Sequence, residues 1–364
     1  MLNEFKVGTN FDLKLLDVFA DINSSSSNGN KITEIYGSDR EHHQLAARPA
    51  FRLPEVDEDA FKKYIAEAKN RGIAFNYTMN SIIPFGSKSE FVKHVDEIIS
   101  FVHFCEEAGV YRITIANPMM LEVIRNIAYS DIELELSTIM HIDTVTQIKY
   151  FYENYGVRKV CCNLNKNRDF KFLERAAEYC NKNGIILELM VNEFCGVGGD
   201  NYATHCVFRD SCYICHATNK TLKDTLTMME YPMGLCTPSR NRNPANWLRL
   251  KFIRPEDIKA YNNIGINHFK ITGRTGSTAY IAKTVKSYLD ESFDGNLLEL
   301  WKPLESIKDN SVENIFYYNI QNKSLDGFLS HWENGFVCDN EVCGQTCKYC
   351  EEFYNKYCKE KNNA

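Results

Sequence analysis

The sequence has no long apolar run and no excess of positive charge. No segment approaches the ~20 consecutive apolar residues of a membrane-spanning helix, so we expect no membrane association. The 42 Lys and Arg residues stand against 48 Asp and Glu, which gives a formal net charge of -6. This balance excludes a broad basic face, and any contact with nucleic acid must be a local patch.

Several signatures are also missing. The sequence contains no G-x-S-x-G, H-E-x-x-H or Walker motif, so the common hydrolase and nucleotide-binding mechanisms lack support. The opening residues "MLNEFKVGTNFDLK" carry charges where a signal peptide needs an apolar core. We therefore expect a cytoplasmic protein, in which cysteines remain reduced and serve as metal ligands, catalytic thiols or buried side chains.

Short β-rich segments alternate with segments of helical spacing, and 44% of the residues are hydrophobic, enough for a large core. The eight candidate strands are 5–9, 31–37, 73–80, 110–117, 132–138, 159–165, 185–192 and 268–274. Strands that alternate with helices form a parallel sheet, and eight such units predict an α/β fold of the (β/α)8 TIM-barrel type. An open doubly wound sheet is the alternative.

The predicted barrel occupies residues 1–290, with a cysteine-rich insertion at 193–254 after the seventh strand and a C-terminal extension at 291–364. Polar residues follow nearly every strand: Asn10, Asn80, Asn117, Thr138, His141, Asn163, Asn165, Asn192, Glu193, Lys270 and Arg274. In a barrel these residues converge on one mouth, where active sites lie. The alternative is that strand ends are polar only because loops are polar.

Four of these residues are candidate catalytic residues: Glu193, Lys270, Arg274 and His141. Glu193 would act as an acid or base, orient a substrate, or form a salt bridge. Lys270 and Arg274, followed by a glycine-containing turn and a helix, form a candidate anion-binding site. Alternatively, either cation pairs with an acidic neighbour such as Glu188 or Glu193.

Nine of the 14 cysteines fall into two groups. The insertion carries Cys195, Cys206, Cys212, Cys215 and Cys236, and four thiolates suit either an iron–sulfur cluster or zinc. Their dispersed spacing favours a cluster, with His205 and His216 as further candidate ligands. The tail carries Cys338, Cys343, Cys347 and Cys350 in C-x4-C-x3-C-x2-C spacing, which predicts a second metal site that holds a cluster or zinc.

The motifs "ELMVNEFC" and "FIRPEDI…GINHFKITGR" resemble the collagenase-like peptidase family, numbered U thirty-two. The segments "IYGSDREHHQLAARP", "GIAFNYTMNS" and "GVYRITIANP" extend the likeness across most of residues 5–290. The resemblance implies a barrel and a [4Fe-4S] cluster bound by four insertion cysteines. Glu193, Cys195, Cys206, Cys236, Lys270 and Arg274 occupy matching positions, and the fourth ligand is Cys212 or Cys215. Two features depart from the family pattern, the wide spacing from Cys195 to Cys206 and the cysteine-rich tail.

Members similar to this chain take part in oxygen-independent hydroxylation of a quinone precursor or of RNA bases, and others were named for collagen degradation. The resemblance thus implies an iron–sulfur oxidoreductase that hydroxylates or otherwise redox-modifies a small-molecule or RNA-borne substrate, with electrons from a donor protein. A peptidase acting on peptides or collagen-like substrates is the first alternative. A noncatalytic binding or scaffold protein with structural clusters is the second.

Overall fold

The computed structural model describes residues 2–193, 243–274, 276–301, 304–308, 311–315, 318–339 and 342–358. The five insertion cysteines lie outside the described residues. Among the residues that are described, no helix is both long enough and apolar enough to cross a membrane.

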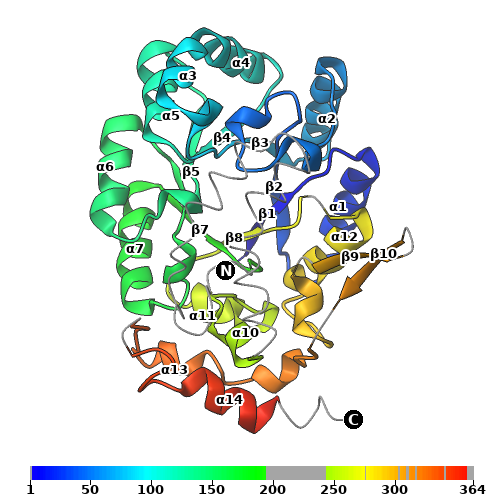
Figure 1. The fold of residues 1–364 in the computed structure, drawn as a ribbon, viewed down its shortest axis with the longest axis vertical. Coiled ribbons are helices and arrows are strands. Elements are labelled where there is room, and N and C mark those ends of the chain that lie inside the picture. The colour runs from blue at the N-terminus through cyan, green and yellow to red at the C-terminus, as the bar shows by residue number, and fades with distance from the viewer. Residues whose placement is uncertain are drawn as a thin grey trace.

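Eight parallel strands form a closed barrel in sequence order, with β8 paired to β1 (Figure 1). The strands are β1 (Glu4–Gly8), β2 (Lys31–Gly37), β3 (Ala74–Met79), β4 (Arg112–Ile115), β5 (Glu133–Leu136), β6 (Lys159–Cys161), β7 (Ile186–Met190) and β8 (His268–Ile271). Each coincides with a segment predicted as a strand. The (β/α)8 prediction is confirmed, and the pairing of β1 with β8 excludes an open sheet.

Helices cover the outside of the barrel. They are α1 (Leu13–Ser25), α2 (Glu58–Asn70), α3 (Lys88–Lys93), α4 (Val95–Glu107), α5 (Pro118–Glu122), α6 (Val145–Tyr155), α7 (Phe170–Asn183), α10 (Ala245–Arg249), α11 (Ile258–Asn262) and α12 (Thr278–Leu289). Local sequence explains their ends: Asp57 accepts a hydrogen bond from Ala60 N at the start of α2, and Gly184 ends α7 with φ 65°.

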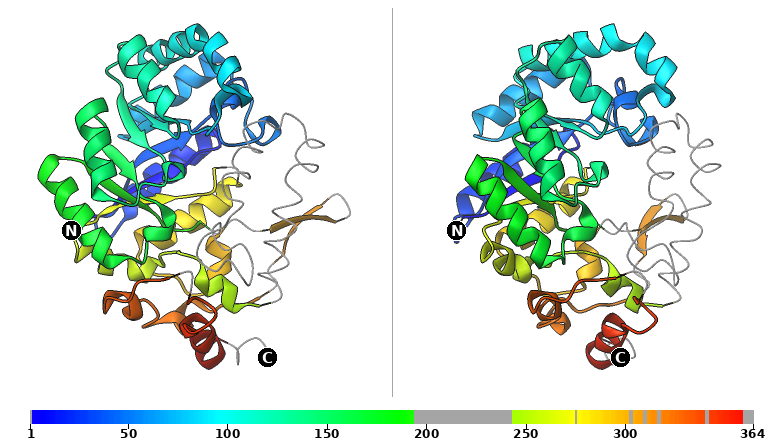
Figure 2. Two further views of the ribbon diagram at one scale, coloured as in Figure 1. Left: turned by 60° about the vertical axis from the view of Figure 1, so that its left-hand side comes forward. Right: turned by 90° about the vertical axis from the view of Figure 1, so that its left-hand side faces the viewer.

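The C-terminal extension packs on one flank of the barrel (Figure 2). It contains β9 (Leu304–Lys308) paired antiparallel with β10 (Ser311–Ile315), followed by α13 (Ser330–Glu333) and α14 (Tyr349–Tyr357). Trp301, Phe328 and Trp332 are buried in the same hydrophobic cluster as the barrel residues, and α14 packs against α10. The extension and the barrel therefore share one core. The division at residue 291 stays a prediction.

The interior of the barrel is charged, whereas barrel interiors are usually filled by apolar side chains. Lys6 of β1 forms ion pairs with Glu135 of β5 and with Glu188 of β7, the latter at 2.9 Å. Lys159 of β6 lies 2.7 Å from Glu188 and 3.1 Å from Glu34 of β2. All five side chains are at most 6% exposed, so each charge is stabilised almost entirely by the others.

Polar neighbours complete this interior network. Arg112 of β4 forms an ion pair with Glu34. The side-chain amide of Asn76 on β3 donates hydrogen bonds to Glu34 at 2.7 Å and to Glu135 at 2.9 Å. Its Oδ1 accepts one from the Thr114 hydroxyl at 2.7 Å. The network therefore joins seven of the eight strands through side chains, independently of the backbone ladder.

Removal of one interior carboxylate should strongly destabilise the barrel. We expect Glu34→Gln to lower the free energy of unfolding by about 3 to 5 kcal/mol, because the buried charges of Lys159 and Arg112 would each lose one of their carboxylate partners. Urea denaturation measures the effect. The matched control is Glu55→Gln, which removes an exposed carboxylate paired with Arg40 and should cost less than about 1 kcal/mol. Equal losses in both variants would contradict the role of the network.

The same network predicts how stability depends on pH. Burial opposes ionisation of Glu34, yet Lys159, Arg112 and Lys6 hold its pKa at about 2, below the ordinary 4.5. The pKa of Glu188 is also lowered, because Lys159 and Lys6 outweigh its burial. A lowered folded-state pKa gives stability that is complete above pH 4.5 and is lost as the pH falls toward 2. Urea midpoints measured across this range should fall less steeply for Glu34→Gln than for the unsubstituted chain.

Candidate active site

The ends of β2 and β8 bring an aromatic ring and a lysine together at the barrel mouth. Lys270 Nζ lies 4.3 Å from the centre of the Tyr36 ring, a distance typical of a cation–π contact. The Tyr36 hydroxyl donates a hydrogen bond to the carbonyl oxygen of Ile271 at 3.3 Å. The Tyr36 ring therefore packs against the lysine.

Lys270 is poorly neutralised. Its one ion pair within the described residues joins Nζ to Glu135 at 3.8 Å, while Glu135 and Glu188 make closer contacts with Lys6 and Lys159. Burial, and then the charge of Lys6, lowers the pKa of Lys270. The acidic neighbour that pairs with Lys270 is therefore Glu135, on β5. A buried ammonium group with only one distant carboxylate would be stabilised by a bound anion.

Arg274 follows β8 and adds a second cation. Its Nη1 donates a hydrogen bond to the Ser38 hydroxyl at 3.0 Å, and it makes no ion pair within the part of the chain that is described. Burial, and then the charge of Arg48, lowers the pKa of Arg274 to about 10. A Cβ atom at Gly8 would lie 2.7 Å from the Arg274 backbone nitrogen, so the close approach of these segments requires glycine there.

Glu193 lies in the same neighbourhood. Burial raises the pKa of Tyr36 to about 12; Arg274, Lys6 and Arg48 oppose this shift, and Glu193 adds to it. Tyr280 of α12 also has a raised pKa, caused by burial and, to a smaller extent, by Glu193. Tyr36 therefore lies close to three of the candidate catalytic residues, Glu193, Lys270 and Arg274. His141, the fourth candidate, lies in the loop after β5 in a left-handed conformation with φ 53°.

Most of the polar amides at the strand ends anchor loops. Asn192 accepts a hydrogen bond from Thr272 N at 2.6 Å and donates one to the Leu300 carbonyl oxygen at 2.9 Å. Asn117 caps α5, and Asn80 accepts from Ala47 N at 3.0 Å. These three side chains therefore agree with the alternative that strand ends are polar only because loops are polar.

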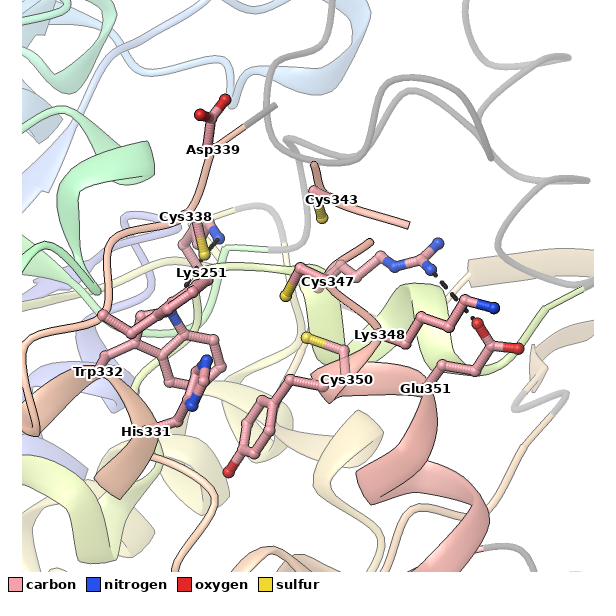
Figure 3. Close-up of a pocket in the computed structure, with 13 residues that line it drawn as sticks. Lys251, His331, Trp332, Cys338, Asp339, Cys343, Cys347, Lys348, Cys350 and Glu351 are labelled. Carbon is pink, nitrogen blue, oxygen red and sulfur yellow. Dashed lines mark hydrogen bonds and ion pairs between the residues drawn. The ribbon is translucent and has the colours of Figure 1, made fainter. Parts of the chain in front are cut away.

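The structure describes only one of the two cysteine groups, the one in the tail. Cys195, Cys206, Cys212, Cys215 and Cys236 fall on residues that are not described, so their ligand roles stay predictions. Cys338, Cys343, Cys347 and Cys350 line one pocket (Figure 3). No three His, Cys, Asp or Glu side chains among the described residues are grouped so that they could hold one metal ion.

Sequence reasoning missed the charged interior of the barrel. The signal was present: Lys6, Glu34, Glu135, Lys159 and Glu188 occupy strand positions that alternate with buried apolar residues, as in "ELEL" of β5. Cys161 of β6 is fully buried, and Lys270, Glu188 and Lys6 lie close enough to affect its pKa, which burial raises to about 12. At neutral pH this thiol is protonated.

Comparison with known proteins gives a distant relative. The chain is 24% identical to an uncharacterized protease of Methanocaldococcus jannaschii over 299 residues, which cover 82% of this chain and 81% of the relative. A U32 peptidase of known structure has 15% identity and a TM-score of 0.43, with 75% of this chain and 94% of that chain covered. The resemblance to the collagenase-like peptidase family is confirmed.

Other likenesses are weaker. A putative racemase from Roseobacter denitrificans is 8% identical with a TM-score of 0.35, over 60% of this chain and 54% of that chain. No family model matches the sequence. The description of the M. jannaschii relative as a protease supports the prediction of an enzyme.

The cations at the mouth should bind a small anion. We expect Lys270→Met to weaken sulfate binding at least tenfold in calorimetric titrations, because the mouth loses a buried charge. The control is Lys323→Met, which removes an exposed lysine paired with Asp294 at 2.7 Å and should leave binding unchanged.

The sulfate affinity of the unsubstituted chain should also fall as the pH rises, because deprotonation of Lys270 removes the attraction and its pKa is lowered. Sulfate keeps its charge over this range, so the loss reports on the protein. Affinity that is independent of both Lys270 and pH would contradict an anion site at this position.

Proposed function

We propose that this chain is an iron–sulfur enzyme of the U32 family that redox-modifies an anionic organic substrate at the barrel mouth, most specifically by oxygen-independent hydroxylation. The observation that carries the substrate class is the surplus of positive charge above the interior network. Lys270, Arg274 and Arg48 gather around Tyr36, and the carboxylates beneath them are already engaged by Lys6 and Lys159.

In this proposal the residues at the mouth bind and orient the substrate. Lys270 contacts an anionic group of the substrate from the floor of the barrel, and Arg274 contacts it from the rim, where Ser38 orients the guanidinium. The apolar surroundings make both contacts stronger than they would be in water. Glu193, at the start of the insertion, is placed to accept or donate a proton at its carboxylate.

The cofactor would be held by the insertion. A [4Fe-4S] cluster needs four thiolate ligands, and the insertion has five thiols, so the residues present suit this cofactor. Cys195, Cys206 and Cys236, with Cys212 or Cys215, would be the ligands. When bound, such a cluster supplies one-electron transfer. Because the insertion leaves β7 at the mouth, substrate and cofactor would meet at the same end of the barrel.

A peptidase is the second candidate, and the description of the M. jannaschii relative as a protease favours it. A cationic mouth would also suit the carboxylate of a peptide. The described thiol nearest this chemistry is a poor nucleophile, because burial raises the pKa of Cys161 to about 12. A peptidase reaction would therefore depend on residues outside the described part of the chain.

Anaerobic purification followed by metal and activity measurements separates these candidates. We expect brown protein with at least about four irons and four sulfides per chain. Cys236→Ala should lose part of the iron, whereas Cys105→Ala, which alters a fully buried core thiol, should keep all of it.

Casein and gelatin cleavage tests the second candidate. The iron–sulfur proposal expects neither protein to be cleaved. Cleavage that persists after iron is removed, together with iron-free Cys236→Ala that remains fully active, would overturn the proposal in favour of a peptidase.

A further inference from the structure

The four tail cysteines come from two short segments that meet in one pocket (Figure 3). Cys338 follows α13, and Cys350 lies in the first turn of α14. Between them the chain makes a tight turn, in which the amide of Cys347 donates to the Val342 carbonyl oxygen at 2.9 Å and the amide of Gly344 donates to the Cys347 carbonyl oxygen at 3.0 Å. This turn brings Cys343 and Cys347 to the same pocket as the other two thiols.

Cys338 is placed as a hydrogen-bond acceptor. Its Sγ accepts from Lys251 Nζ at 3.0 Å and from the indole nitrogen of Trp332 at 3.1 Å. A neutral thiol is a weak acceptor, whereas a thiolate or metal-bound sulfur accepts charged N–H donors well. Two donors on one sulfur therefore indicate that Cys338 carries negative charge in its working state.

Cations surround the rest of the pocket. Arg249 lies against the cysteine turn, since a Cβ atom at Gly344 would be 3.4 Å from its Nη2. Arg168 is 2% exposed, lies 4.5 Å from the Trp332 ring and makes no ion pair within the described residues. Two carboxylates also line the pocket: Asp339, and Glu351, which lies 3.9 Å from Arg249 and has a side chain that is 43% exposed. Buried cations of this kind need an anionic partner, and four thiolates around a metal centre carry net negative charge.

The four thiols share one pocket, but within the described residues they are not grouped for a single metal ion. Four sulfurs around one zinc ion lie about 3.8 Å apart, the edge of a tetrahedron with Zn–S bonds of about 2.3 Å. No three potential ligands among the described residues are grouped for a single ion, although all four thiols face one pocket. In a cubane each thiolate binds a different iron, so its four sulfurs stand farther apart.

We propose that Cys338, Cys343, Cys347 and Cys350 bind an iron–sulfur cluster, separate from the one proposed for the insertion, and that Lys251 positions and partly neutralises it. Asn167 connects this site to the barrel, because its side-chain amide donates to the carbonyl oxygens of Met190 and Lys251, each at 2.8 Å. The tail cluster would therefore be anchored at the end of β7, the strand from which the insertion leaves.

Removal of the insertion ligands tests this site on the full chain. The variant C195A/C206A/C212A/C215A/C236A, purified without oxygen, should retain about four irons and about four sulfides per chain. Addition of Cys347→Ala and Cys350→Ala should remove them. Cys358→Ala is the control, because Cys358 lies in the same extension, is buried and does not line the pocket.

Three results would overturn the proposal. The insertion variant could hold one zinc ion that is lost with Cys347→Ala, it could hold no metal, or the iron content could be the same with and without the tail cysteines. If the insertion variant does not fold, the comparison is made between the unsubstituted chain and C347A/C350A, which should differ by about four irons. If the insertion holds no cluster, the two chains should still differ by these irons. The proposed function and the tail site can therefore be overturned independently.

Lys251 has a test of its own. Lys251→Met should keep the iron but make the reduction potential of the tail cluster more negative, because a nearby cation stabilises the reduced, more negative state. Lys251→Arg should restore the potential. An unchanged potential in Lys251→Met, measured by redox titration followed by electron paramagnetic resonance, would overturn the role of this lysine.

Discussion

The ion network inside the barrel is the constraint on which the rest of the structure depends. Lys6 pairs with carboxylates of β5 and β7, and Lys159 pairs with carboxylates of β2 and β7, so each lysine needs at least one strand that is not its neighbour. These charges can be buried only when the barrel is closed. Closure and charge pairing therefore stabilise each other, and a change of register in one strand would expose the charges of several others to an apolar environment.

The same network determines the charge of the mouth. Because Glu34, Glu135 and Glu188 are engaged by Lys6, Lys159 and Arg112, little negative charge remains for the cations above them. Lys270 keeps one distant carboxylate, and Arg274 has a hydroxyl partner. The predicted anion binding at the end of the barrel thus follows from the arrangement of its interior.

The tail pocket is joined to this end of the barrel by a short chain of contacts. The Asn167 amide holds the backbones of Met190 and Lys251 together, and the Lys251 ammonium contacts Cys338. Lys251, near the end of the insertion, therefore serves both as a wall of the tail pocket and as a support for the seventh strand. In the proposed enzyme the tail cluster would lie beside β7, the strand that precedes the insertion.

The sequence by itself determined the eight strands, the helix ends at residues such as Gly184 and the spacing of the tail cysteines, because strand periodicity, helix termination and turn geometry are local properties. It also placed Lys270 and Arg274 at the mouth. Only the tertiary structure decided that Lys270 faces Glu135 and Tyr36, that the alternating charges of the strands form one network and that Lys251 meets Cys338. Those partners are far apart in the sequence, and their distances depend on how the barrel closes and how the extension packs against it.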